Sequence, residues 1–285
     1  MISSRRTLVA VLCLTTSAGV AAPVPSPRAP PPQVATRPLS DLKIAATISI
    51  GKTADWVAVS SDGVWIGSTG PYAVNEIDPH THRVTQVQLP GEPCAGLAVD
   101  TDSLWVPLCG TKRTKPRLAK VDLKTRTLAR VFDVGPAGPE GGIAVGAGSV
   151  WMVTDRHGSL ARIDPTSGSI LQTMHVPAGS YNPYFSDGHI WVTRVVGAEV
   201  SSVDANTGEV VAHRTTGQHP RFLTAGAGAV WTLNQKSGTI SRIDLAGGRT
   251  DERTGDYEGT TGRRAKDDYG KGSGWQDRPF DTGRR

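Results

Sequence analysis

The sequence has no apolar segment long enough to cross a membrane as a helix, which takes about 20 apolar residues. Its longest apolar run, residues 8–14, follows Arg5 and Arg6, and small residues continue from it to residue 22. This arrangement is typical of a secretory signal peptide. We therefore predict that residues 1–22 are removed on export, and that the protein is secreted or periplasmic and has no transmembrane segment.

The body of the chain also has no excess of either positive or negative charge. The formal net charge is +5 at pH 7, but residues 41–248 contain 18 basic and 18 acidic residues. Domains that bind nucleic acid carry a basic patch or stripe, so no nucleic-acid partner is expected. Residues 112–130 hold eight Lys and Arg against Asp122 alone, which is more typical of a solvated loop and strand edge than of an anion site.

The motifs of common catalytic and metal sites are absent as well. The sequence has no Ser, His and Asp in the order of a catalytic triad, no phosphate-binding glycine loop and no spaced Cys and His quartet. His80 and His82 lie together in DPHTHRV, but this stretch reads as a hairpin turn in which His82 takes a glycine position. We predict no catalytic residue, no metal site and no cofactor.

What the sequence does contain is a repeat. Residues 142–179 hold four runs rich in Val, Ile and Leu, separated by turn residues and by no segment of helix length. Trp151 lies in the second run and Asp164 ends the third, and both recur along the chain at intervals of 40 to 46 residues. The tryptophan counterparts are Trp65, Trp105, Trp191 and Trp231, and the aspartate counterparts are Asp78, Asp122, Asp204 and Asp244.

A period of about 40 residues with four strands per copy predicts an all-β fold, a β-propeller of four-stranded antiparallel blades. Five blades are visible. The second run is apolar at successive positions, as in VWIG and VWMV, which is expected when each blade is sandwiched between two neighbours. The repeated tryptophan is therefore expected to pack between blades rather than to bind a ligand.

The repeat also carries a family resemblance. GLAVDTDSLW and GIAVGAGSVW, each followed by a strand ending in Asp and a turn such as PTSG, resemble the YVTN and streptogramin (virginiamycin B) lyase group of β-propellers over about residues 42–246. The resemblance implies the fold. The lyases have seven blades and open a macrolactone by metal-assisted elimination, with a catalytic His and Mg²⁺-binding Glu residues on late blades. This chain has no counterpart of those blades, and no catalytic residue is carried over.

The two ends of the repeat region complement each other. Residues 42–51 match a fourth run with no copy before it, and the last copy stops after its third run. We therefore expect this N-terminal strand to complete the last blade and close the ring, which removes two free edges. The propeller then spans residues 41–248, after a proline-rich linker at residues 23–40. Residues 249–285 have no Val, Ile or Leu and 17 charged residues, and are expected to be a disordered tail of either a natural five-bladed ring or a truncated longer propeller.

Two sets of loops should share one face of such a ring. They are the loops that lead into the first strand of each blade and those that join its second and third strands. Aromatic and cationic side chains gather in them, which suits a small polar or anionic ligand. The candidates are Trp56, Tyr72, Lys112, Arg113, Arg156, His157, Tyr181, Arg194, His219 and Arg221.

We therefore predict an exported, monomeric binding or interaction module that uses this face for a small polar or anionic ligand or a protein partner. The alternative is a truncated or incomplete enzyme of the streptogramin-lyase type, a carbon–oxygen lyase that acts by metal-assisted lactone elimination. The repeat pattern alone specifies the fold better than the activity.

Removal of the signal peptide leaves only Cys94 and Cys109, and exported thiols tend to pair. In an antiparallel hairpin with its turn near Thr101 and Asp102, opposed residues have indices that sum to about 203, and the two cysteines meet this condition. We predict a disulfide between them. The alternative, two half-buried thiols, follows if a one-residue bulge turns the side chains apart.

Overall fold

The computed structural model describes residues 39–245 and 250–254. The chain divides into a short unit, Met1–Thr47, and a large unit, Ile48–Arg285. The short unit contains the 3-10 helix η1 (Leu39–Asp41). The predicted signal peptide, most of the proline-rich linker and most of the charged tail lie outside the described residues.

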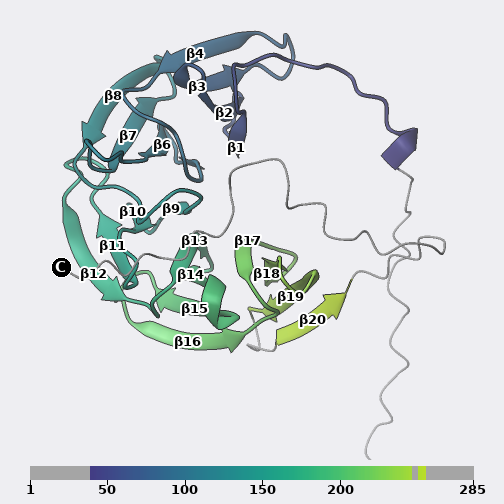
Figure 1. The fold of residues 1–285 in the computed structure, drawn as a ribbon, viewed down its shortest axis with the longest axis vertical. Coiled ribbons are helices and arrows are strands. Elements are labelled where there is room, and N and C mark those ends of the chain that lie inside the picture. The colour runs from purple at the N-terminus through teal and green to yellow at the C-terminus, as the bar shows by residue number, and fades with distance from the viewer. Residues whose placement is uncertain (1–38, 246–249, 255–285) are drawn as a thin grey trace, which may run out of the picture. The chain divides into compact units, whose positions relative to one another are not determined.

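The large unit contains five antiparallel sheets, each of four strands in sequence order. They are the blades of a propeller, with the first strands around the axis and the fourth strands at the rim (Figure 1). Blade 1 consists of β1 (Asp55–Val59), β2 (Val64–Thr69), β3 (Tyr72–Ile77) and β4 (Val84–Gln88). Blade 2 consists of β5 (Ala98–Val99), β6 (Ser103–Leu108), β7 (Arg117–Asp122) and β8 (Thr127–Phe132).

The later blades repeat this plan, and a 3-10 helix, η2 (Val195–Gly197), joins β14 to β15. Blade 3 consists of β9 (Ile143–Gly146), β10 (Ser149–Val153), β11 (Ser159–Ile163) and β12 (Ile170–His175). Blade 4 consists of β13 (Ser180–Ser186), β14 (His189–Arg194), β15 (Glu199–Asp204) and β16 (Val210–Thr215). Blade 5 consists of β17 (Pro220–Gly226), β18 (Ala229–Asn234), β19 (Thr239–Asp244) and β20 (Thr250–Thr254).

The repeated aspartate organises the turn between the third and fourth strands. In blade 3, Oδ1 of Asp164 accepts hydrogen bonds from the backbone N–H groups of Thr166 (3.0 Å) and Ser167 (2.6 Å). Gly168 then adopts a positive φ of 75°, which costs glycine little. Such hydrogen bonds favour the ionised carboxylate and lower its pKa, for Asp78 to about 2. The pKa is lowered in the same way at Asp122, Asp164 and Asp204.

The repeated tryptophan packs between blades, as predicted. Trp151 of blade 3 is fully buried against Ile190, Val192 and Val203 of blade 4. Trp65 packs in the same way on blade 2, and Trp105 on blade 3. Burying side chains of this size stabilises the ring by roughly 25 cal/mol per Å² of apolar surface. The core is therefore a series of interfaces between consecutive blades.

A cation covers the repeated tryptophan in three blades. In blade 2, Nζ of Lys120 lies 5.1 Å from the centre of the Trp105 ring and donates a hydrogen bond to the backbone oxygen of Pro165 in the next blade (3.1 Å). In blade 3, Arg162 lies 5.4 Å from the Trp151 ring, and its Nη1 donates to the backbone oxygen of Asn206 (3.4 Å). The side chain thus links its own tryptophan to a turn of the following blade.

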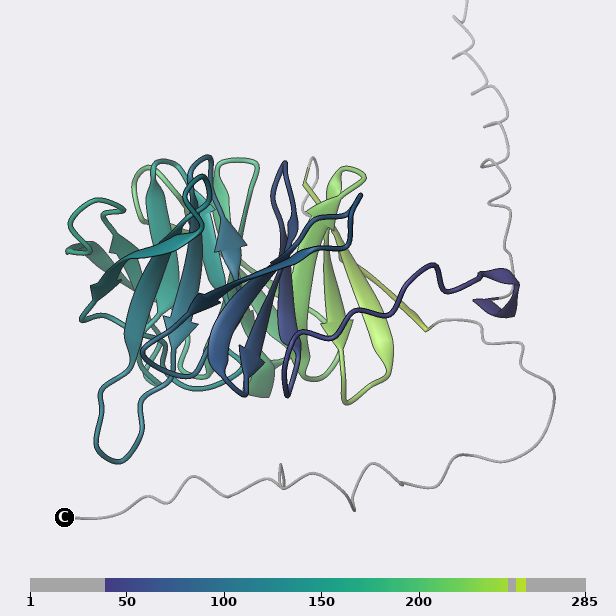
Figure 2. The same ribbon diagram turned by 90° about the horizontal axis from the view of Figure 1, so that it is seen from above.

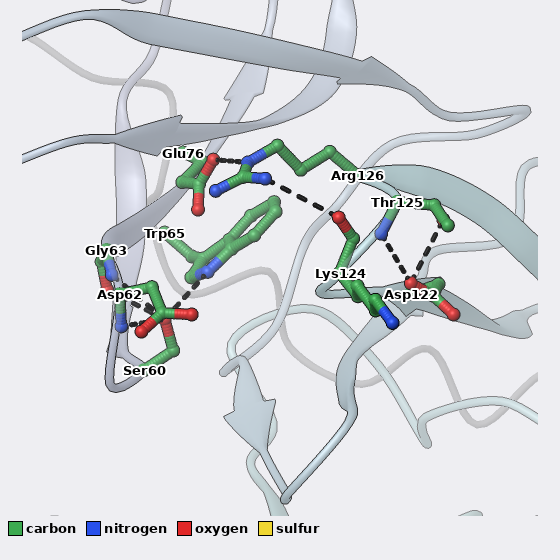
Figure 3. A network of polar contacts seen from close by, with 9 residues as sticks. All are labelled: Ser60, Asp62, Gly63, Trp65, Glu76, Asp122, Lys124, Thr125 and Arg126. Atoms are coloured by element: carbon green, nitrogen blue, oxygen red, sulfur yellow. Dashed lines mark hydrogen bonds and ion pairs between the residues drawn. The ribbon is translucent and has the colours of Figure 1, made fainter.

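Blade 1 reverses the charges of this arrangement. Glu76 stands opposite Trp65 in the strand register, at the position where blades 2, 3 and 5 carry the cation. Its side chain is only 6% exposed and forms an ion pair with Arg126, which comes from the Asp122 turn of blade 2 (Figure 3). The pair raises the pKa of the Arg126 guanidinium, chiefly through the hydrogen bond to Glu76. Here the cation comes from the following blade instead of the preceding one.

The prediction that residues 42–51 complete the last blade is wrong. The fourth strand of blade 5 is β20, which pairs antiparallel with β19 and lies in the segment assigned to the tail. Residues 42–51 form no strand. Ile50 is buried instead, and the backbone oxygen of Lys52 accepts a hydrogen bond from the N–H of Thr69 in blade 1 (3.0 Å). The fourth strand of a blade faces solvent, so it can form through backbone pairing without the apolar pattern that the sequence comparison sought.

The predicted disulfide between Cys94 and Cys109 is present, with the two Cα atoms 5.6 Å apart. The strand register holds the index sum of 203 at Ala98 opposite Trp105. Farther from the turn the register shifts, and Pro93 pairs with Leu108. The cysteines are therefore diagonal rather than directly opposed, and the bridge spans this shift.

Among the residues described, no helix is long and apolar enough to span a membrane.

Candidate functional site

The two predicted loop sets lie on one face of the ring, which we call the loop face. Backbone hydrogen bonds join the two sets: the N–H of Gly179, at the entry to blade 4, donates to the oxygen of Arg156 in blade 3 (3.3 Å), and within blade 5 the N–H of Gln235 donates to the oxygen of His219 (2.9 Å). The insertion between β6 and β7 extends beyond the other loops of this face (Figure 2). The ten candidate residues are therefore grouped on one side.

Backbone hydrogen bonds also join neighbouring blades where their first strands begin. The N–H of Glu140 in blade 3 donates to the oxygen of Cys94 in blade 2 (2.8 Å), and the N–H of Gly142 donates to the oxygen of Tyr181 in blade 4 (3.4 Å). Nδ2 of Asn182 donates to the backbone oxygen of Arg221 in blade 5. This series of bonds runs from blade 2 to blade 5 around the axis of the ring, and we call this central part of the loop face the mouth. It provides the rigid support that a binding site requires.

Arg221 is the centre of a charged group on this mouth. Its guanidinium lies 5.8 Å from the centre of the Tyr181 ring, and its Nη2 lies 3.5 Å from Oε2 of Glu140. The Tyr181 hydroxyl donates a hydrogen bond to the backbone oxygen of Pro139. We call Glu140, Tyr181 and Arg221 the mouth cluster. It joins blades 3, 4 and 5.

Burial raises the pKa of the Tyr181 phenol above its ordinary value. Glu140 raises this pKa further, while Arg221 and Arg156 lower it, so Arg156 is within electrostatic range of the cluster. The phenol is a neutral hydrogen-bond donor at neutral pH. The cluster with Arg156 has two cationic groups and one carboxylate, a net positive charge.

Three buried polar atoms at the mouth have no hydrogen-bond partner among the described residues. They are Nε of Arg221, Nε1 of Trp56 and Oδ1 of Asn182. Buried polar atoms are nearly always paired with protein or ordered water. Two of the three are N–H donors whose hydrogen-bonding capacity the described residues do not use.

Trp56 takes part in a contact that the sequence analysis did not predict. Its ring lies 5.7 Å from that of Phe222, edge to face, and joins β1 of blade 1 to β17 of blade 5. Trp56 has a positive φ of 57°, which is uncommon for a bulky residue. Phe222 follows the candidate Arg221 directly, but an aromatic residue within a strand carries no signal of its own.

The remaining candidates lie apart from the mouth cluster or have structural partners. Nε of Arg194 donates to the backbone oxygen of Ala178 (3.0 Å), and its Nη1 lies 3.5 Å from Oε1 of Glu199. The backbone N–H of His157 donates to Oδ1 of Asp155 (2.8 Å), while the His157 side chain is exposed. Exposed positions on the loops of blades 1 and 2 are held by Tyr72, Lys112 and Arg113.

Two hollows lie away from the loop face. A hollow of about 390 Å³ lies between the hairpins of blades 2 and 3, lined by residues that include Asp102, Lys120 and Thr166. A second of about 310 Å³ is lined by residues of β8 and of the Asp164 turn, such as Arg130 and Ser167. Neither contains a candidate residue. Within the described ranges, no three His, Cys, Asp or Glu are close enough together to hold a metal ion.

Comparisons with protein-family models and with curated proteins found no match. Solved structures similar to this chain include BamB from Moraxella catarrhalis, with a TM-score of 0.51 and 17% sequence identity over 68% of this chain and 58% of that one. They also include a nidogen/laminin complex, with a TM-score of 0.57 and 14% identity over 72% of this chain and 81% of that one. The computationally designed protein Ika8 gives 0.52 and 16%, over 70% and 61%. The chain thus spans less than two thirds of BamB, and at these identities the likeness shows the fold alone: the chain is a β-propeller of five four-stranded antiparallel blades.

Proposed function

We propose that this protein is an exported binding module that holds an anionic ligand at the mouth cluster of the loop face. The ligand chemistry is a carboxylate or phosphate group. The observation that carries the proposal is the position of Arg221, whose guanidinium lies on Tyr181 and near Glu140 while its Nε has no hydrogen-bond partner among the residues that the structure describes. Export rests on the N-terminal sequence and fits the disulfide, which is typical of oxidising compartments.

The geometry favours an anion for two reasons. Arginine binds carboxylate and phosphate through parallel N–H groups, and the Nη2 atom of Arg221 is 3.5 Å from Glu140, beyond the distance of a strong charge-assisted bond. A ligand oxyanion can therefore displace Glu140 from the guanidinium. Arg156 adds positive charge from the neighbouring loop, and His157 and His219 complete the set expected to contribute.

The test is binding of citrate and of inorganic phosphate to the mature protein, measured by titration calorimetry at low salt. We expect saturable binding that weakens as salt screens the exposed charges. Arg221→Gln and Arg156→Gln should each lower the affinity by about tenfold, since a charge-assisted hydrogen bond contributes about 1.5–3 kcal/mol. The matched control is Lys124→Gln, which removes an exposed cation on the opposite face.

Equal affinities for the wild type and for a variant with Arg156, His157, His219 and Arg221 all replaced would overturn the proposal. Phosphate binding without citrate binding would assign the site to phosphate esters, and the reverse to carboxylates. The narrower likeness to the streptogramin-lyase group rests on the repeat residues alone, and no lyase step is proposed here.

A further inference from the structure

Among the described residues, blades 1 and 5 each have one face that no other blade covers. On blade 5 this face carries Leu233 and Ile240, which are 48% and 46% exposed. On blade 1 it carries Val57 and Val59, which are 61% and 69% exposed. We call these surfaces the free faces. Exposed apolar patches of this kind mark interaction sites more often than single exposed residues do.

The free face of blade 5 is one half of the interface that the other blades form. Its Leu233 and Ile240 occupy the repeat positions of Val153 and Leu160 in blade 3, which are buried against blade 4. Arg242 lies 5.6 Å from the Trp231 ring, as Arg162 does over Trp151. In blades 2 and 3 that cation also reaches a backbone oxygen of the following blade. Blade 5 thus presents an aromatic and cationic surface shaped for a following blade.

The free face of blade 1 is the other half. By repeat position, its Val64 and Ile66 correspond to Ile190 and Val192, the residues of blade 4 that cover Trp151. Val57 and Val59 correspond in the same way to Leu97 and Val99, which pack into the interface beneath Trp65. The turn after β3, with Asp78 and Pro79, corresponds to the turns whose oxygens accept from Lys120 and Arg162.

These two halves do not cover each other within one chain. Trp56 and Phe222 join the first strands of blades 1 and 5 at the axis, yet the apolar side chains farther along both faces stay about half exposed or more. A chain with two complementary faces that it does not join internally can join them between copies. Such a contact is heterologous, because each copy uses a different surface.

We propose that the free face of blade 5 in one copy binds the free face of blade 1 in a second copy, head to tail. Trp231, Leu233 and Ile240 then pack on Val57, Val59 and Ile66 of the other copy. Arg242 of the first copy donates to the backbone oxygens of the Asp78 turn in the second copy. This proposal differs from the monomer expected from the sequence, and it is independent of the ligand proposed for the mouth cluster.

The test is sedimentation velocity of the mature protein from roughly 1 to 100 µM, a range in which weak dimers dissociate. We expect a reversible dimer or longer assembly. Val59→Glu on blade 1 and Ile240→Glu on blade 5 should each weaken association by about a hundredfold, because each buries a charge without a partner. Both positions are exposed in the single chain, so neither change disturbs its fold. The matched control is Val211→Glu, at a residue 51% exposed on the rim strand of blade 4.

Mixing the two variants gives the decisive result. The Val59→Glu copy keeps an intact blade 5 face and the Ile240→Glu copy an intact blade 1 face, so the mixture should form a dimer that neither forms alone. A monomer at all concentrations would overturn the proposal and favour either closure within the chain or a different protein partner. Association that both variants leave unchanged would overturn it as well. Loss of association without rescue in the mixture would assign the contact to two identical faces.

Discussion

Trp151 and Trp231 have the same local structure and different surroundings. The indole N–H of each donates to the backbone oxygen of a glycine five residues earlier, Gly146 at 2.9 Å and Gly226 at 3.0 Å. An arginine covers each ring at a similar distance. Yet Trp151 is fully buried, whereas Trp231 is partly exposed. A blade therefore positions its tryptophan by itself, but only a neighbouring blade removes that side chain from water.

The largest effect should separate these two residues. Trp151→Ala removes a large side chain from a closed interface and is expected to lower the free energy of unfolding by about 3–5 kcal/mol. Trp231→Ala should cost less, by about 1–2 kcal/mol, since part of its surface is already hydrated. Urea denaturation at low protein concentration measures both. Equal losses would mean that the free face of blade 5 is covered in solution.

The disulfide of blade 2 strengthens the closed part of the ring. Replacing Cys94 and Cys109 together by Ser opens a loop of 15 residues and is expected to cost about 3 kcal/mol in the chain-entropy model. The measurement is urea denaturation of the double variant beside the oxidised wild type. The reduced wild type serves as the control and should match the variant.

Replacing the charged residues next to the tryptophans should also lower stability more at a closed interface than on a free face, but by less than replacing the tryptophans. Glu76→Gln leaves Arg126 without its carboxylate in the interface of blades 1 and 2, and we expect a loss of about 1–2 kcal/mol. The figure is modest because the Arg126 side chain is 37% exposed. Arg242→Gln lies on the free face and should change stability by less than about 0.5 kcal/mol. A larger loss at Arg242 than at Glu76 in thermal melts would contradict the comparison.

The smallest expected effect is on the stability of the protein at low pH. The carboxyls of Asp78, Asp122, Asp164 and Asp204 have lowered pKa values in the folded chain, with Asp78 at about 2. Their stabilising effect is complete above the unfolded pKa of about 3.9 and is lost as the pH falls toward the folded values. Asp164→Asn should therefore reduce the loss of stability between pH 4 and pH 2, compared with the wild type, in parallel thermal melts. An unchanged acid profile would show that the turn carboxylate has no part in it.

The inner three strands of each blade were predictable because their residues face neighbouring blades. The apolar pattern around Trp151 and the Asp164 turn reflects that packing directly. The fourth strand of blade 5 was not predictable because TDERT has no apolar residue, and its antiparallel pairing with β19 leaves no pattern in the sequence. Residues 42–51 resemble a strand because Ile48 and Ile50 alternate. Alternating apolar residues indicate that one side of a segment is buried, but they do not indicate which part of the molecule it packs against.

The candidate site was predictable at the level of a face and not at the level of contacts. Loop connectivity alone places Tyr181 and Arg221 on the same side of a propeller. The sequence gives no measure of how far apart two loops end, so Arg194 and Arg221 looked alike. The structure separates them: Arg194 contacts Ala178 and Glu199, whereas Arg221 contacts Tyr181 and Glu140 of the mouth cluster.

The reversed ion pair between Glu76 and Arg126 bears on how the blades find their order during folding. Similar repeats can pair with the wrong neighbour, since most blades offer alike surfaces. Arg126 stands at a turn position with positive φ, where blades 3 and 4 have Gly168 and Gly208. A blade 1 docked on either of those blades would leave the Glu76 carboxylate buried without a counterion, at a cost of several kcal/mol. One exchanged pair of charges thus makes the first interface of the ring selective for its correct partner.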